Sequence, residues 1–299
     1  MKRAKSFGVR GLSPEERAAA NPYWGQKVPM GGMISPGLHR GMQTVAGSSS
    51  WGMSLDEGLR RFMLNVYNYM MLGLVVTAIM AFFTYHSAVT TDLSQAAVSE
   101  AGVALALNDT EYLTPWGVWL YLTPVSYVIC FGPLAVLLFA GGVFRNLDFV
   151  PSMIVYMIVA ALIGVSFATL AFCYTDSSIT RVFFVTAATF GCLSLFGYTT
   201  RKDLSGWGCF LWMGFFGLLV AIIANIIWPS DMLQFTISAV GVIVFAGFTA
   251  YDTQMIRDAY RSDLTEDKLH ALALNGAVDL YLDFINLFRF LMTFLGEEE

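Results

Sequence analysis

The stretch Asp279-Leu280-Tyr281-Leu282-Asp283-Phe284-Ile285-Asn286-Leu287-Phe288 places two carboxylates inside an apolar run near the end of the chain. An earlier apolar run climbs to Thr249-Ala250-Tyr251-Asp252-Thr253-Gln254, and a charged hairpin joins the two runs. A charged side chain at the centre of a bilayer costs roughly 2.5–3.5 kcal/mol on insertion scales, so acids at such positions are usually functional. We therefore expect the functional site in the last two apolar runs.

The composition of the chain is that of a polytopic membrane protein. Of its 299 residues, 56% are hydrophobic and only 13% are charged, whereas soluble domains average about 25% charged residues. The net charge is −5 and there is no long basic tract, so nucleic acid is not an expected partner. The sequence contains no Walker loop, His-Glu-x-x-His motif or nucleophile elbow, and its four cysteines lack metal-ligand spacing. We therefore predict neither an enzyme nor a resident cofactor.

Seven apolar runs, each about 17–25 residues long, are sufficient to cross ~30 Å of hydrocarbon. They cover residues 66–83, 120–144, 152–174, 182–198, 207–228, 233–250 and 272–295. We predict an all-α integral membrane protein with seven transmembrane helices over residues 61–299, preceded by a flexible tail over residues 1–60. The acidic loop 87–114 has an alanine-rich middle, residues 96–107, that could form a short surface helix.

The basic residues indicate the orientation of these helices. The first 61 residues carry nine Lys and Arg residues. Most of the others lie in the loops that follow the second, fourth and sixth apolar runs. The loops on the opposite side contain only Arg181, beside the turn between the third and fourth runs. Because positively charged loops stay in the cytoplasm, the N-terminus is predicted to be cytoplasmic and, with seven spans, the C-terminus lies on the outside.

Helical geometry places the polar residues of the last run on one face. At 100° per residue, Asn275, Asp279, Asp283 and Asn286 fall within about 100° of arc. Such a stripe is expected to face the bundle interior or a wet cavity rather than lipid. The short hairpin makes the last two helices antiparallel neighbours, so Asp252 can meet either Asp279 or Asp283.

Two neighbouring carboxylates cannot both ionise cheaply, so such a pair can share a proton and respond to pH. The pair could also bind or release a cation, and Ca²⁺ prefers oxygen ligands. Simpler alternatives remain for each acid: a solvated helix-end residue at Asp252, a structural hydrogen bond at Asp283, and an ion pair from Asp279 to Lys268.

Two motifs, Gly247-Phe248-Thr249-Ala250-Tyr251-Asp252-Thr253-Gln254 and Leu280-Tyr281-Leu282-Asp283-Phe284-Ile285-Asn286-Leu287-Phe288, strongly resemble the Bax inhibitor-1-like (transmembrane BAX-inhibitor-motif) family in its bacterial branch. The segment Gly197-Tyr198-Thr199-Thr200-Arg201-Lys202-Asp203-Leu204 agrees as well. The likeness covers about residues 62–296. It implies a seven-helix bundle with the last helix at its centre, in the bacterial inner membrane.

The resemblance also implies a function, namely a pH-sensitive Ca²⁺ leak channel gated by an aspartate pair. The matching residues are Asp252 and Asp283, which would contact Ca²⁺ transiently and keep the pore shut while they share a proton. Arg145 matches, by position, an arginine that pairs with an aspartate in the open form. Relatives that conduct can carry an acid inside the second helix, and residues 128–138 contain none. Asp279 is an additional acid, and we hypothesise that it compensates for this absence.

A second function implied by the family is regulation of another membrane protein. Bacterial relatives look like modulators of an ATP-dependent membrane protease, and eukaryotic ones like suppressors of cell death. The long N-terminal tail favours this alternative, because a pore does not need it. The expected partners are thus the lipid bilayer and a membrane protease or other membrane protein.

Overall fold

The computed structural model describes residues 57–98, 103–107, 111–129, 132–133, 135–136, 144 and 148–297, together with the backbone of residues 38–56. The chain divides into two compact units, Met1–Gly52 and Met53–Glu299. Its elements, in chain order, are α2 (Leu38–Ala88), β1 (Val89–Thr90), β2 (Tyr112–Leu113), α3 (Pro115–Tyr121), α5 (Phe149–Phe167), α6 (Leu170–Cys173), α7 (Asp176–Thr199), α8 (Trp207–Ile227), α9 (Asp231–Ala259) and α10 (Glu266–Leu295).

Within the described residues, five helices are long and apolar enough to cross a membrane. They cover Glu57–Ala88, Phe149–Cys173, Asp176–Thr199, Trp207–Ile227 and Asp231–Ala259. A mostly helical chain with apolar spans is therefore confirmed, and five of the seven predicted spans are found among the described residues. The count of seven stays a prediction. The second predicted run, 120–144, lies mostly outside the described residues. Helix α10, the predicted seventh span, contains Asp279, Asp283 and Arg289 and is not one of the five.

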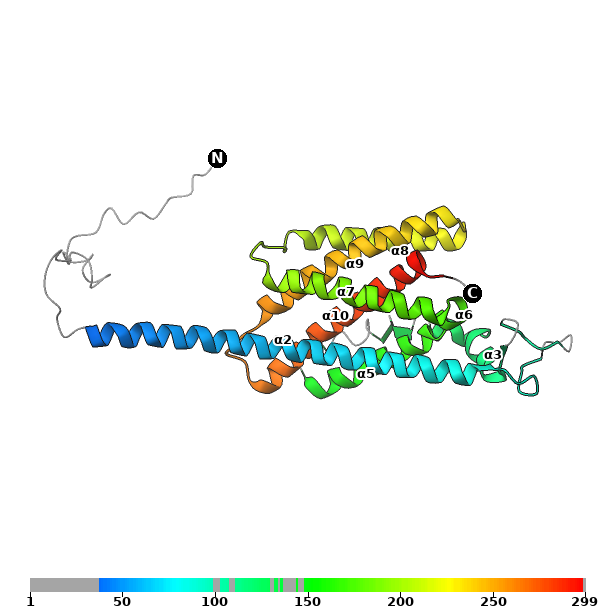
Figure 1. Ribbon diagram of the computed structural model, residues 1–299, viewed down its shortest axis with the longest axis horizontal. Helices are drawn as coiled ribbons and strands as arrows, with labels where there is room; N and C mark the ends of the chain where they lie inside the picture. Colours follow the sequence, from blue (N-terminus) through cyan, green and yellow to red (C-terminus); the bar gives the residue numbers. More distant parts are fainter. Residues whose placement is uncertain are drawn as a thin grey trace, which may run out of the picture. The chain divides into compact units, whose positions relative to one another are not determined.

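Helix α10 occupies the centre of the second unit. It packs against α9, α7 and α5, and Figure 1 shows it (orange to red) with α7 and α9 on one side and α2 and α5 on the other. Its apolar residues are correspondingly inaccessible to solvent. Those with no exposed surface are Ala271, Ala273, Leu274, Ala277, Leu280, Tyr281, Leu287 and Met292.

A buried hydroxyl pair ties α10 to two further helices. The Tyr281 hydroxyl lies 2.6 Å from Thr77 Oγ1 on α2, and Thr77 Oγ1 donates to the Ala160 carbonyl of α5 at 3.0 Å. Because the single hydroxyl proton of Thr77 is used for Ala160, Tyr281 must be the donor in the first bond. Both polar groups are thereby satisfied, which removes the cost of burying them in an apolar bundle.

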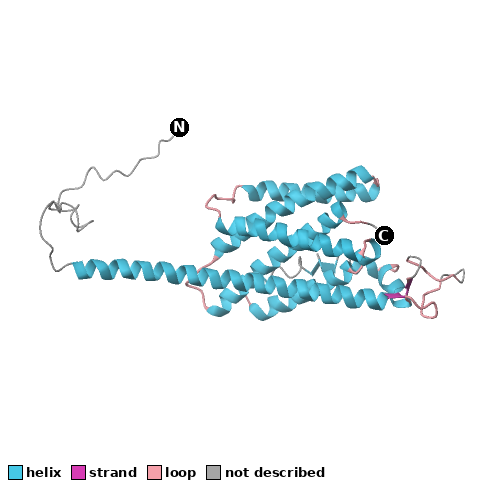
Figure 2. Cartoon of the chain, in the orientation of Figure 1, coloured by secondary structure: helices cyan, strands magenta, loops and turns pink. Residues whose placement is uncertain are grey.

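The loop between α2 and α3 is extended rather than helical. Strands β1 and β2 pair antiparallel (Figure 2), and isolated bridges join Val98 to Ala104 and Ala106 to Tyr112. The expectation of a surface helix over residues 96–107 is thus wrong for the part of that stretch which the structure describes. Backbone hydrogen bonds to a neighbouring strand, such as Ala97 N to Leu113 O at 2.7 Å, override the helix propensity of alanine, because intrinsic propensity is weak compared with tertiary contacts.

Helices α7 and α9 approach closely at Gly197. A side chain there would collide with the backbone carbonyl of Ala250, which cannot move independently of α9. By contrast, a β-carbon at Gly217 of α8 would meet nothing within 4 Å. The two glycines therefore differ in packing, and both lie within helices.

We expect Gly197→Ala to lower the thermal unfolding temperature of the detergent-purified protein, because overpacking costs about 1–3 kcal/mol. The matched Gly217→Ala variant should be neutral or slightly stabilising, since alanine is favoured over glycine by up to ~1 kcal/mol inside a helix. Equal melting temperatures for the two variants would contradict the close approach of α7 and α9.

Candidate functional site

Asp252 of α9 and Asp283 of α10 meet inside the second unit. Their carboxyl groups lie close enough to interact directly. Asp283 is buried, with 5% of its surface exposed, and Asp252 is half-buried. An ionised carboxylate only accepts hydrogen bonds, so a hydrogen bond between the two groups would require a proton on one of them. The arrangement is therefore a close carboxyl pair that can share a proton.

One carboxyl oxygen of Asp283 lacks a hydrogen-bond donor. This atom, Oδ2, is buried and receives no N–H or hydroxyl hydrogen bond from the described residues. An unsatisfied buried acceptor is costly, and an unsatisfied buried charge more so. A structural hydrogen bond is the simpler reason that the sequence allows for an acid at Asp283. The Oδ2 atom does not make such a bond with a backbone or hydroxyl donor of the described residues.

Asp279 lies one turn before Asp283 and interacts electrostatically with both members of the pair. In contrast to them, it is exposed, and it forms none of the ion pairs found among the described residues. The three acids thus differ in exposure, from exposed Asp279 through half-buried Asp252 to buried Asp283. The sequence left open which acid Asp252 meets; its direct neighbour is Asp283, with Asp279 nearby.

The two asparagines of the predicted polar stripe have separate surroundings. Asn275 Nδ2 donates to the Phe144 carbonyl at 2.8 Å. Asn286 Nδ2 donates to the Leu282 carbonyl of its own helix at 2.8 Å. Its side chain also lines a cavity of about 300 Å³ between α8, α9 and α10, beside Arg289, and none of the three acids lines that cavity.

Two predicted roles remain predictions. Arg145 lies outside the described residues. The transient Ca²⁺ contact at Asp252 and Asp283 involves only two side chains, and Ca²⁺ takes six to eight oxygen ligands. Among the described residues, no group of three or more His, Cys, Asp and Glu side chains is placed to hold a metal ion.

Polar residues just after Asp252, to which the sequence analysis assigned no role, anchor the loop between α7 and α8. Gln254 donates to the Lys202 carbonyl at 2.8 Å and accepts from the Leu204 amide at 2.7 Å. Arg257 Nη1 donates to the Tyr198 carbonyl at the end of α7, also at 2.8 Å. A glutamine within an apolar helix is the sequence signal that could have identified these contacts between α9 and the α7–α8 loop.

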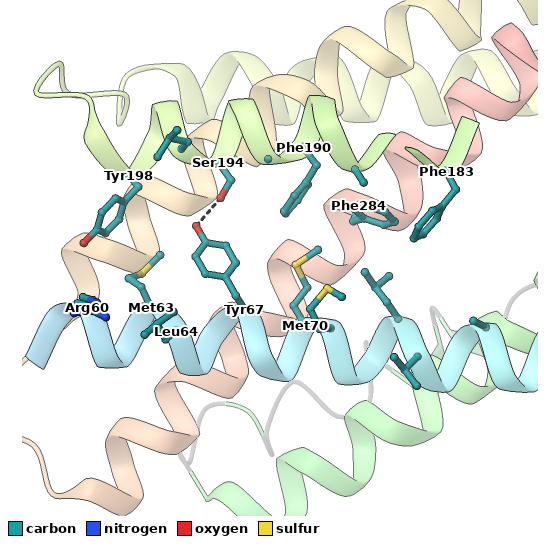
Figure 3. Close-up of a pocket in the computed structure, with 17 residues that line it drawn as sticks. Arg60, Met63, Leu64, Tyr67, Met70, Phe183, Phe190, Ser194, Tyr198 and Phe284 are labelled. Atoms are coloured by element: carbon teal, nitrogen blue, oxygen red, sulfur yellow. Dashed lines mark hydrogen bonds between the residues drawn. The ribbon is translucent and has the colours of Figure 1, made fainter. Parts of the chain in front are cut away.

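A chain of hydroxyl groups links three helices beside the acid pair. The Tyr67 hydroxyl of α2 lies 2.7 Å from Ser194 Oγ of α7 (Figure 3). Ser194 Oγ lies 3.0 Å from Thr253 Oγ1 of α9, and Thr253 follows Asp252 in the chain. These bonds hold α9 against α7 and α2 at the level of the site.

Comparison with known proteins identifies the family of the chain. Residues 59–299 match the family model described as "Inhibitor of apoptosis-promoting Bax1". The chain is 42% identical over 245 residues to a Caulobacter vibrioides protein, covering 82% of this chain and 91% of the relative. It is 35% identical over 241 residues to the inner membrane protein YbhL of Escherichia coli, covering 80% and 92% of the two chains. As its two acidic motifs predicted, the chain belongs to the Bax inhibitor-1-like family of membrane proteins.

Proposed function

We propose that this protein is a pH-gated cation leak channel of the bacterial inner membrane, with Ca²⁺ as the expected ion. The observation that carries the proposal is the close approach of the carboxyl groups of Asp252 and buried Asp283. A pair that holds one proton keeps α9 and α10 together. Loss of that proton leaves two like charges in contact, which favours separation of the helices.

The location of the acids supports an ion path between α9 and α10. Exposed Asp279 offers a cation its first carboxylate, half-buried Asp252 the next, and Asp283 the innermost one. Intramembrane acids commonly mark ion and proton pathways. Two or three carboxylates supply only part of the coordination of Ca²⁺, so the contacts are those of an ion in transit rather than of a resident metal.

In this proposal the chain crosses the membrane seven times. The spans are the five apolar helices, α10, and the second apolar run over residues 120–144. The basic residues around Arg60, Arg61, Arg201 and Lys202 would lie on the cytoplasmic side with the N-terminus. The relative YbhL is named as an inner membrane protein, which supports the same location for this chain.

The gate is tested by Ca²⁺ flux into dye-loaded liposomes that contain the purified protein. We expect the wild-type leak to rise as the pH is raised through the range in which the pair loses its shared proton. Asp283→Asn removes one of the two charges and supplies an amide that can donate to Asp252. Its leak should remain low at every pH, at least about tenfold below the wild-type maximum, which corresponds to ~1.4 kcal/mol.

Asp267→Asn is the matched control, because Asp267 is an exposed acid in the first turn of the same helix. This variant should keep the pH profile of the wild type. The proposal fails if Asp283→Asn has the wild-type profile, or if the wild type conducts no cation at any pH.

The carboxyl pair itself is tested by a double-mutant cycle on unfolding free energy. With Asp252→Asn, Asp283→Asn and the double variant, we expect a coupling energy of about 0.5–3 kcal/mol at the pH of lowest leak, as for residues in direct contact. The cycle of Asp267 with Asp283, sixteen residues or about 24 Å apart on one helix, should be additive within ~0.5 kcal/mol. Additivity in both cycles would contradict the contact.

A further inference from the structure

A cavity of about 780 Å³ lies between α2 and α7, with Phe284 of α10 in its wall. We call it the α2–α7 groove. Figure 3 shows that methionine and phenylalanine side chains from the two helices point into it, among them Met63, Met70 and Phe190. Its volume is within the range of about 300–1,000 Å³ that is typical of ligand sites. Water is a poor occupant, because the apolar wall offers few hydrogen-bonding partners.

The shape of the groove is that of an extended chain. On α2 its lining runs from Arg60 to Ala78, eighteen residues or about 27 Å of helix. This length approaches the ~30 Å thickness of bilayer hydrocarbon. A long, narrow, apolar space that follows a transmembrane helix matches a lipid acyl chain better than a compact ligand.

A transmembrane helix of another protein does not fit between the same walls. The Tyr67 hydroxyl and Ser194 Oγ are 2.7 Å apart, so α2 and α7 are joined directly across the groove. A helix with its side chains is about 10–12 Å wide and would have to break this bond. An acyl chain can lie against it.

One end of the groove carries a positive charge. Arg60 and Tyr198 lie at this end, whereas Phe183 and Phe284 lie at the other (Figure 3). Arg60 is exposed and forms none of the ion pairs found among the described side chains, in contrast to its neighbour Arg61, which pairs with Glu57. A guanidinium group matches the geometry of a phosphate, and basic residues at the end of a transmembrane helix attract anionic lipids.

We infer that the α2–α7 groove binds one acyl chain of an anionic phospholipid, whose phosphate pairs with Arg60. The chain runs from Arg60 past the Tyr67–Ser194 hydrogen bond towards Phe284. Phe284 directly follows Asp283 in α10, so the lipid and the carboxyl pair contact the same turn of the central helix. This site is independent of ion conduction, and its failure would leave the proposed gate unaffected.

Binding of the acyl chain in the α2–α7 groove is tested with phosphatidylglycerol that carries a photoactivatable diazirine in this chain. The lipid is incorporated into liposomes containing the full-length protein. A β-carbon at Gly191, which lines the groove, would meet nothing within 4 Å. The first atom of a side chain at Gly191 thus has room, and Gly191→Trp should project into the groove and lower the labelling of α2 and α7 peptides about tenfold, or ~1.4 kcal/mol. Gly217→Trp, equally open but on α8 outside the groove, should leave the labelling unchanged.

The headgroup contact is tested by competition between phosphatidylglycerol and phosphatidylcholine with identical tails. The wild type should favour phosphatidylglycerol, Arg60→Gln should lose this preference, and Arg61→Gln should keep it. Both arginines are exposed, so neither change is expected to impair folding.

The inference is overturned if labelling is the same in Gly191→Trp and Gly217→Trp, which indicates contact with bulk lipid only. It is also overturned if Arg60→Gln retains the preference, or if the groove is crosslinked to a co-purified protein instead of lipid.

Discussion

The arrangement of the bundle depends on shielding α10 from lipid. This helix carries Asp279, Asp283 and Arg289 among apolar residues, and charged side chains facing hydrocarbon are costly. Packing against α9, α7 and α5 encloses it, and the hydrogen bond from Tyr281 to Thr77 attaches it to α2. The neighbouring helices can then expose apolar side chains to lipid, while Asp283 of α10 stays buried.

The same burial gives the acid pair its chemistry. Asp283 has no donor at Oδ2 among the described residues, and the carboxyl group of Asp252 lies beside it. The position of Asp252 is in turn secured by the residues that follow it. Gln254 and Arg257 hold the end of α7 and the loop after it, and Thr253 bonds to Ser194. One short segment of α9 thus contains both the ionisable Asp252 and the residues that fix α9 against α7 and the loop after it.

Much of the fold was predictable from local sequence. Apolar runs of membrane-spanning length predicted the helices, and five of the described ones are long and apolar enough to span. The local approach was wrong for residues 96–107, where alanine content suggested a helix but pairing with Leu113 and Tyr112 produces bridges. Strand pairing is a contact between distant residues, and composition within a short window does not record it.

For the site, the sequence by itself determined which residues matter chemically. Acids inside apolar runs are conspicuous because of their cost in hydrocarbon, and helical periodicity placed Asp279 and Asp283 near one another on one face. Only the tertiary structure decided that Asp252 lies beside Asp283, that Asn286 lines a different cavity, and that α2 and α7 leave a groove ending at Arg60. Asp252 and Asp283 are separated by a hairpin and belong to different helices. Their contact depends on how those helices rotate and pack against each other, and the periodicity of a single helix contains no information about that.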